Sequence, residues 1–258
     1  MKLLISPAKK MRVDRDFLLP EAQPALVERS AQLLDYLRRL SLGELQKLLA
    51  CNQALAEEAY RNFQSMDLEH GETPAVLAYD GIQYKYMAPG LLTQEQLVYL
   101  GDHLRILSGF YGVLRPFDGV CPYRLEMQAK LKTDFCRNLY QFWGDSLGNY
   151  LLEEDRVFVN LASEEYGKAV RPYVKDKARF VTCIFGEEQP TGQLVEKGVY
   201  VKMARGEMVR YAAERCAVSP EDLKGFNRLG YTFAEDLSGE ETYAFRRKQE
   251  RKTTRKKQ

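Results

Sequence analysis

The sequence predicts a single α+β domain in which helices and strands alternate irregularly along the chain. Its 45% hydrophobic and 29% charged residues lie within the range of ordinary globular proteins, and 258 residues are enough to bury a full core. Neither a repeat nor a linker divides the sequence. We therefore expect one compact mixed domain over residues 1–247, followed by a basic disordered tail at residues 248–258.

The N-terminal half predicts both strands and helices. Short apolar runs that end at turn residues indicate buried strands, whereas leucines at helical spacing and capping-box sequences indicate helices. In order, we expect a strand at 2–5, a helix at 26–40, a helical segment from the capping box at 41–44 to residue 63, a strand at 74–79, and a helix from the capping box at 93–96 to about residue 103. Residues 104–109 (LRILSG) fit a continued helix or a buried strand, and we favour the strand.

The C-terminal half continues the same mixture. Strand composition is found in three segments, and a serine followed by proline marks the start of a helix. We expect a helix that ends at residues 142–144, strands at 156–161, 178–185 and 198–203, a helix at 204–216, and another helix that begins at Ser219-Pro220.

The composition argues against several classes of protein. The opening run MKLLI is shorter than the roughly 7 to 15 apolar residues of a signal-peptide core, so we expect a cytoplasmic protein without membrane contact. The five cysteines form no Cys-x-x-Cys pair, and only two histidines are present. This pattern predicts neither a disulfide framework nor a metal site, and we expect no metal and no other cofactor.

The net charge of +2 is unevenly distributed. Residues 246–258 carry eight Lys and Arg against one Glu, a local charge of +7, and the rest of the chain is therefore about −5. A basic tail of this kind attracts polyanions whatever their sequence. The same composition is also typical of a solvated, disordered terminus.

Three cations, Lys202, Arg205 and Arg210, surround the expected start of the 204–216 helix. Unpaired N–H groups and the positive end of the helix dipole favour an anion at such a start, so cations placed there need a compensating partner. That partner is a bound phosphate or an internal carboxylate such as Asp80 or Glu126. We favour a bound anion.

A second basic cluster lies within residues 168–179. It contains Lys168, Arg171, Lys175, Lys177 and Arg179. The cluster fits a groove for a phosphate backbone, and it fits equally an exposed edge kept soluble by its charges. In addition, the expected helix, turn and helix at 204–226 has the geometry that presents backbone N–H groups to one DNA strand.

Polar residues gather in the sequence around a glycine-containing turn at residues 108–112 (SGFYG). This turn has no Gly-Lys-Ser/Thr and is therefore not a P-loop. Tyr111, Tyr123, Arg124 and Glu126 are of the types that a nucleobase or sugar pocket uses for hydrogen bonding and proton transfer. The alternative is a structural turn whose buried tyrosines bond to the backbone. Nucleophilic hydrolysis is unsupported, because no histidine lies near a motif Ser or Cys.

Seven segments match a known family in order along about residues 1–247. They are ISPAK at 5–9, AVLAYDG at 75–81, LRILSGFYGVLRPFDGVCPYRLEM at 104–127, YQFWGD at 140–145, NLASEEY at 160–166, KMARGEMVRY at 202–211 and GFNRLGYTF at 225–233. Together these segments resemble the YaaA family of peroxide stress proteins, and the block at 104–127 is the most specific. One departure is Lys10-Met11, which stands where the family start reads Thr-Leu.

The resemblance implies a cytosolic protein that protects against hydrogen peroxide, with a positively charged cleft, a helix-hairpin-helix element and affinity for double-stranded DNA. We place the helix-hairpin-helix at 204–226, with 97–115 as the alternative. Two hypotheses follow. The first is a DNA-binding protein of largely sequence-independent affinity, which contacts DNA or another phosphate-bearing ligand through Lys202, Arg205, Arg210, Lys168, Arg171 and Arg124. The second is an enzyme acting on a nucleotide, nucleobase or related small anion, with candidate catalytic residues Lys9, Asp80, Tyr111, Tyr123 and Glu126.

Overall fold

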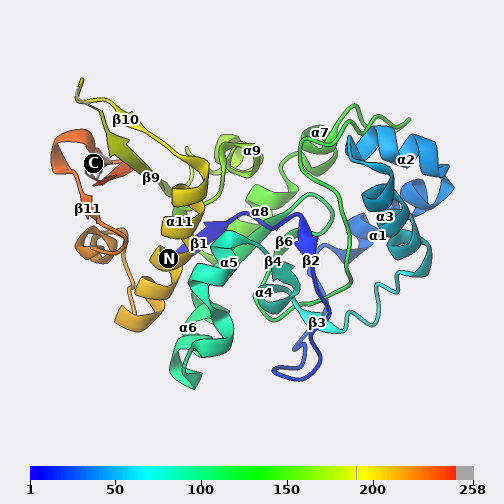
Figure 1. The fold of residues 1–258 in the computed structure, drawn as a ribbon, viewed down its shortest axis with the longest axis horizontal. Coiled ribbons are helices and arrows are strands. Elements are labelled where there is room, and N and C mark those ends of the chain that lie inside the picture. Colours follow the sequence, from blue (N-terminus) through cyan, green and yellow to red (C-terminus); the bar gives the residue numbers. More distant parts are fainter. Residues whose placement is uncertain (190, 248–258) are drawn as a thin grey trace, which may run out of the picture.

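A central eight-stranded sheet organises the computed structural model of the protein, which describes residues 1–189 and 191–247 (Figure 1). The strand order is β11-β12-β9-β8-β1-β5-β6, and β10 pairs with the far end of β9. The five strands from β12 to β5 run parallel, whereas β6, β10 and β11 are antiparallel to their neighbours. The bounds are β1 Lys2–Ile5, β5 Leu104–Ser108, β6 Gly112–Leu114, β8 Val157–Asn160, β9 Arg179–Glu188, β10 Leu194–Val195, β11 Tyr231–Phe233 and β12 Thr242–Arg247.

Two small strand pairs lie outside the main sheet. β2 (Lys10–Met11) pairs with β4 (Tyr79–Asp80), and β3 (Thr73–Pro74) pairs with β7 (Gly119–Val120), both antiparallel. The first pair joins the segment that follows β1 to the segment that precedes α5 (Ile82–Met87). It thereby brings two distant parts of the sequence to one edge of the sheet.

Helices pack around the sheet, and three of them form one end of the molecule (Figure 1). In Figure 1, α1, α2 and α3 gather at one end of the molecule, and β9 to β12 lie at the other. The helices are α1 Val27–Arg39, α2 Leu42–Leu49, α3 Gln53–Ser65, α4 Ala75–Ala78, α5 Ile82–Met87, α6 Gln94–His103, α7 Leu139–Trp143, α8 Ser146–Glu154, α9 Glu164–Gly167, α10 Arg171–Val174 and α11 Gly198–Arg215, with short 3-10 helices η1 Pro89–Leu91, η2 Pro220–Gly225 and η3 Glu235–Leu237.

The core is centred on the parallel strands. Leu3, Leu4 and Ile5 of β1 are fully buried, and all residues of β5 are buried as well. Continuous apolar strands of this kind are typical of parallel sheets covered on both faces. The prediction of one body of mixed helices and strands is confirmed, but the mostly parallel sheet places it nearer to α/β proteins than to the expected α+β class.

Local sequence signals predicted several elements correctly. The strands expected at 2–5, 104–109, 156–161 and 178–185 correspond to β1, β5, β8 and β9. Both capping boxes are formed, with Ser41 and Glu44 at the start of α2 and Thr93 and Gln96 at the start of α6. The helical segment expected to run to residue 63 is interrupted after α2, where Ala50 adopts a left-handed conformation.

Three predictions of elements were wrong. Residues 198–203, expected as a strand, form the first turns of α11, because their apolar residue Val201 continues the buried face of Ala204 and Met208. Residues 74–79 form a short helix between two-residue strands. The segment after Ser219 is a 3-10 helix of six residues, although its capping box is formed.

The earlier start of α11 changes the argument made for its cations. Because the helix begins at Gly198, Lys202 and Arg205 lie inside it and not at its N-terminal amides. The positive end of the helix dipole acts only over the first turn. An anion at these residues would therefore be held by side chains.

Candidate binding cavity at the carboxyl edge of the sheet

A cavity opens at the carboxyl ends of β1 and β8, which are neighbouring parallel strands. Ser6 follows β1 and Ser163 lies just beyond β8, and the Ser163 N–H donates to Ser6 Oγ over 2.8 Å. β5, the next parallel strand of the chain after β1, lies on one side of β1, whereas β8 and β9 lie on the other. Such a switch in strand order leaves a crevice, and ligands of α/β proteins bind in crevices of this kind.

The cavity has a volume of about 370 Å³ and carries both signs of charge. Five cations line it: Lys9, Lys10, Arg124, Lys202 and Arg205. Three carboxylates line it as well: Asp80, Glu126 and Glu165. The volume falls within the range of small-molecule sites, which is about 300 to 1,000 Å³.

Three side-chain donors of the cavity wall lack hydrogen-bond partners. These are Gln83 Nε2, Arg124 Nε and Arg205 Nε, all buried and unpaired within residues 1–189 and 191–247. Buried N–H groups are normally paired, and leaving one unpaired costs about 1 to 3 kcal/mol. Three residues that line the cavity thus carry unpaired buried N–H groups.

Arg205 stands out among these donors. It forms neither a hydrogen bond nor an ion pair with any residue that the structure describes. Burial lowers the pKa of its guanidinium, and the charge of Glu196 acts in the opposite direction. The guanidinium stays protonated nonetheless, as arginine does in proteins. The cavity wall thus contains a largely buried cation.

The internal carboxylates considered as partners of Arg205 bond elsewhere. Glu126 Oε2 lies 2.8 Å from Lys9 Nζ, and Glu126 Oε1 lies 3.3 Å from Arg124 Nη2. Asp80 lies 3.4 Å from Lys85 Nζ. Glu126 and Asp80 are therefore paired with other cations, and neither is bonded to Arg205.

Close packing of two helices positions Gln83 and Arg205. α5 and α11 meet at Gly206, where an added Cβ atom would lie only 2.1 Å from the carbonyl oxygen of Gln83. Only glycine permits this approach. Arg205, the residue before Gly206, and Gln83 thus line the same cavity from two helices in close contact.

Tyrosines form the inner wall. The Tyr123 hydroxyl lies 2.9 Å from the Tyr79 hydroxyl and 2.7 Å from Ser108 Oγ, and Tyr84 donates to the carbonyl oxygen of Ser6 over 3.0 Å. Burial raises the pKa of Tyr84 well above its ordinary value. Tyr111 lies behind this wall, where its hydroxyl accepts the Cys121 N–H over 3.0 Å.

The structure separates the predicted site residues into two groups. Those that line the cavity are Lys9, Asp80, Tyr123, Arg124, Glu126, Lys202 and Arg205. Arg210, by contrast, pairs with Glu214 at 2.8 Å and Arg171 with Glu164 at 2.7 Å, while Lys168 lies 4.5 Å from the centre of the Tyr140 ring. These three cations already have partners away from the cavity.

Several lining residues were missed by sequence reasoning. Gln83, Tyr84 and Tyr166 carry no local signal that distinguishes them from core or surface residues. Ser6 and Ser163 could have been found, because each follows a segment of strand composition and the carboxyl ends of parallel strands meet at one edge.

The segment predicted to contain a helix-hairpin-helix has its turn amides occupied. The N–H groups of Val218 and Ser219 both donate to Asp222 Oδ2 over 2.9 Å. A carboxylate thus takes the place that a DNA phosphate would need, and the second element is the short 3-10 helix η2. The geometry gives this segment no free anion-binding amides at the turn.

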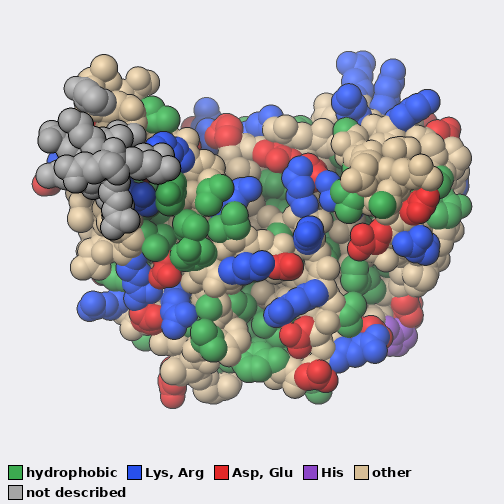
Figure 2. Space-filling model, viewed as in Figure 1, with side chains coloured by type: hydrophobic (Ala, Val, Ile, Leu, Met, Phe, Trp, Pro, Cys, Tyr) green, Lys and Arg blue, Asp and Glu red, His purple; other side chains and the backbone are tan. Residues whose placement is uncertain are grey.

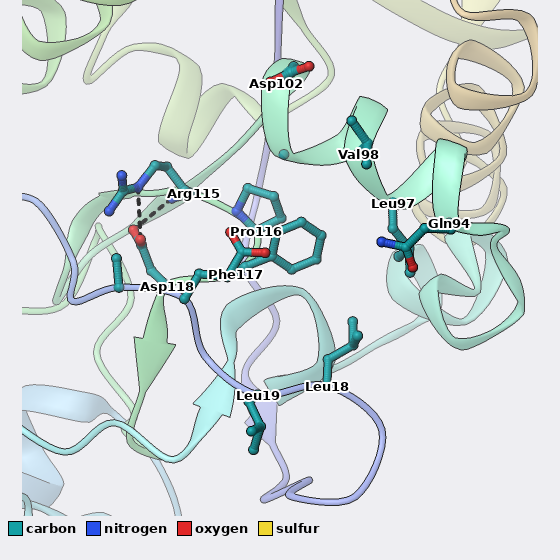
Figure 3. Close-up of a pocket in the computed structure, with 13 residues that line it drawn as sticks. Leu18, Leu19, Gln94, Leu97, Val98, Asp102, Arg115, Pro116, Phe117 and Asp118 are labelled. Atoms are coloured by element: carbon teal, nitrogen blue, oxygen red, sulfur yellow. Dashed lines mark hydrogen bonds and ion pairs between the residues drawn. The ribbon is translucent and has the colours of Figure 1, made fainter.

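A second cavity, of about 470 Å³, lies between α6, residues 18–22 and the turn at 115–118 (Figure 3). Its wall includes Leu19, Val98 and Phe117, and two of its charged residues are paired with each other, since Arg115 Nε donates to Asp118 Oδ1 over 2.9 Å. None of the unpaired buried donors of the described chain lines it. We therefore regard the cavity at the carboxyl edge as the candidate site.

The face that contains α11 and β2 is mixed in charge. Figure 2 shows Lys and Arg side chains interspersed with Asp and Glu across the middle of this face, between these two elements. A uniformly positive cleft is not seen on it. Within residues 1–189 and 191–247, no group of three or more His, Cys, Asp or Glu side chains is arranged to hold a metal ion. No helix in this part of the chain is long and apolar enough to cross a membrane.

The fold and the cavity define an α/β protein with a ligand-sized polar site at a switch in strand order. The chain matches the family model described as "Peroxide stress protein YaaA" over residues 1–237, and it belongs to that family. It is 54% identical to a UPF0246 protein of Desulfitobacterium hafniense over 95% of this chain and 97% of the relative. It is also 48% identical to UPF0246 proteins of Agathobacter rectalis and Pediococcus pentosaceus, over 96% and 95% of this chain and 99% and 97% of those relatives.

Proposed function

We propose that the cavity at the carboxyl edge binds a small anionic ligand of the nucleotide class. The observation that carries this proposal is the unpaired state of three N–H groups, Gln83 Nε2, Arg124 Nε and Arg205 Nε, on residues that line the cavity. Phosphate or carboxylate oxygens would accept from these donors, and hydrogen bonds of this charge-assisted kind are about twice as strong as neutral ones. Lys202, exposed on the same helix as Arg205, adds a second positive charge at the rim.

The carboxylates of the cavity favour a ligand that also donates hydrogen bonds. Asp80 and Glu165 line the same space as the unpaired donors, so a ligand with an acidic group at one end and N–H groups at the other matches both kinds of side chain. A nucleotide has both features. The candidate catalytic residues Lys9, Asp80, Tyr123 and Glu126 line the same space, which supports an enzyme acting on such a ligand.

The size of the cavity favours a single small molecule over a duplex. A space of about 370 Å³ admits a molecule of nucleotide size and is far too small for double-stranded DNA. A duplex would touch only the rim.

Calorimetric titration with adenosine 5′-monophosphate and with inorganic phosphate tests the proposal. Arg205→Ala should lower the affinity for both by at least about tenfold, because a hydrogen bond to a charged group contributes about 1.5 to 3 kcal/mol. Arg210→Ala is the matched control, since Arg210 lies on the same helix and pairs with Glu214 outside the cavity. If both variants bind like the wild type, the cavity is not the anion site.

We propose association with double-stranded DNA as a second function. Support comes from Lys168, Lys175 and Lys177, which are exposed on neighbouring turns, and from the basic composition of residues 248–258, which lie outside the described residues. Such contacts neutralise phosphates without reading bases, so binding would be strongly salt-dependent. The family description supports a role for either activity in resistance to peroxide stress, which a deletion strain exposed to hydrogen peroxide would test.

A further inference from the structure

A chain of three hydroxyl groups leads from the core to the cavity. Ser108 is fully buried, Tyr79 is 2% exposed, and Tyr123 lines the cavity between them. Ser108 Oγ lies 2.7 Å from the Tyr123 oxygen, which lies 2.9 Å from the Tyr79 oxygen. Distances alone leave the direction of each hydrogen bond open, but the partners of each oxygen determine it.

Ser108 has one possible role toward Tyr123. Its oxygen accepts the N–H of Phe110 over 3.1 Å and the N–H of Tyr111 over 2.8 Å. A serine hydroxyl has two acceptor positions and one donor. Both acceptor positions are filled, so Ser108 donates its proton to the Tyr123 oxygen.

Burial decides the direction between the two tyrosines. If Tyr123 donated to Tyr79, the Tyr79 proton would be left in the core beside Ser108, whose oxygen already accepts two N–H groups. An unpaired buried donor is costly. Donation from Tyr79 to Tyr123 avoids that cost, and it leaves the proton of Tyr123, a residue that lines the cavity, available to a ligand.

We infer that Tyr123 is the neutral hydrogen-bond donor of the cavity and that it donates to an acceptor atom of the ligand, a carbonyl oxygen or a ring nitrogen. Ser108 and Tyr79 are positioning residues that donate to the Tyr123 oxygen. This inference rests on the proposed function for the identity of the ligand, but the direction of the hydroxyl chain stands without it.

The arrangement also increases the strength of the donor. Donation from two hydroxyls draws electron density from the Tyr123 oxygen and stabilises negative charge on it, which makes its own proton a better donor. Burial raises the pKa of Tyr123 to about 12, while the hydrogen bonds from Ser108 and Tyr79 lower it. Tyr123 therefore keeps its proton at neutral pH. The tyrosine ring is held in place by Phe110 and Tyr111, at 5.2 and 5.4 Å between ring centres.

Hydroxyl exchange in the ligand-free protein tests the direction of the chain. Tyrosine labelled with ¹³C at the ring carbon that bears the hydroxyl gives two lines in an equal mixture of H₂O and D₂O when exchange is slow, and one line when it is fast. We expect two lines for Tyr79, whose proton is bonded in the core, and one line for Tyr123, whose proton has no acceptor in the inferred chain. Two lines for Tyr123, or one line for Tyr79, would overturn the inference. Tyr79→Phe and Tyr123→Phe assign the signals.

Titration with the same adenosine 5′-monophosphate and phosphate tests the contact with the ligand. Tyr123→Phe should weaken nucleotide binding by roughly tenfold, the effect of one lost hydrogen bond, and should leave phosphate binding unchanged because phosphate meets the arginines. Tyr111→Phe, a buried tyrosine behind the wall, is the control. Unchanged nucleotide affinity in Tyr123→Phe would refute donation to the ligand. If the wild type binds neither probe, the proposed ligand class fails, and the exchange pattern still decides the direction of the hydroxyl chain.

Discussion

At the scale of the residue, the unusual group is Arg205, a largely buried cation without a partner among the described residues. Natural proteins pair buried charges, because desolvation is otherwise uncompensated. A charged residue with a perturbed pKa that lines a cavity is a candidate for a binding site. The proposed ligand would supply the partner that Arg205 lacks among the described residues.

Replacing Arg205 should therefore not destabilise the protein. Arg205→Met keeps much of the side-chain volume and removes the desolvated charge, so we expect the free energy of unfolding to stay unchanged or to rise by about 1 kcal/mol. Urea unfolding measures it. A decrease of several kcal/mol in the free energy of unfolding would instead indicate that Arg205 is paired with an internal carboxylate, which is the alternative that the sequence left open. Arg210→Met, which breaks a partly exposed ion pair, should change stability by less than about 1 kcal/mol.

Asp118 gives a prediction about pH. Burial raises the pKa of this carboxyl to about 6, against the opposing effect of Arg115, and the residue is 1% exposed. The pKa of Asp118 is higher in the folded protein than in the unfolded chain. The contribution of this carboxyl to the free energy of unfolding is therefore fully present below about pH 4 and is lost as the pH rises toward 6. The stability of the wild type relative to Asp118→Asn should fall by about 1 to 3 kcal/mol over this interval. Urea unfolding at several pH values measures the difference, and an opposite slope would contradict the shift.

At the scale of the element, the contact between α5 and α11 depends on Gly206. A methyl group there would overlap the carbonyl oxygen of Gln83, which lies 2.1 Å from the ideal Cβ position. The two helices would have to separate, and with them Gln83 and Arg205. The packing of these helices is therefore both a structural and a functional requirement.

Gly206→Ala should destabilise the protein by about 1 to 3 kcal/mol, as overpacking does, and should also weaken nucleotide binding. Thermal unfolding and calorimetry measure the two effects. The control lies on the same helix: around Gly198 no atom is within 4 Å of an added Cβ, so Gly198→Ala should be neutral or stabilising. Equal behaviour of the two variants would show that the close approach is unimportant.

Sequence reasoning succeeded at this scale where the signal is local. The caps at Ser41 and Thr93 and the apolar strands were found because a few neighbouring residues decide them. The strand expected at 198–203 was wrong because its apolar residue Val201 lies on the buried face of a helix whose further members, Ala204 and Met208, come after this segment. The charged residues of the cavity could likewise be proposed from their chemistry alone. That Arg205 and Gln83 have unpaired donors depends on neighbours that are distant in the sequence and that only the fold brings together.

At the scale of the whole molecule, charge is divided between body and tail. Residues 1–247 carry 32 Lys and Arg against 35 Asp and Glu, whereas residues 248–258 carry six against one. A body of net charge −3 repels DNA at long range, apart from its local basic cluster. Any DNA binding should therefore depend strongly on the tail.

A variant lacking residues 248–258 should bind duplex DNA more weakly than the full chain, without losing all affinity. The deletion begins after Arg247, because Arg246 and Arg247 belong to β12. Fluorescence anisotropy at several salt concentrations measures both affinity and salt slope, and each lost phosphate contact should lower the slope by about 0.9. Binding that does not change with salt would exclude contacts to the DNA phosphates. Complete loss of DNA binding on deletion of residues 248–258 would exclude a contribution from Lys168, Lys175 and Lys177.

The position of β1 at the centre of the sheet has a consequence for folding kinetics. β1 is made before both of its neighbours in the sheet, since Leu3 pairs with Leu104 on one side and with Val159 on the other. Until both partners have left the ribosome, the apolar segment KLLI has no native neighbour. Contacts of such long sequence separation slow folding and prolong the exposure of unpaired strand edges. The sheet around β1 should thus form only after residue 160 has been made, and the nascent chain should be sensitive until then to aggregation and to the supply of chaperones.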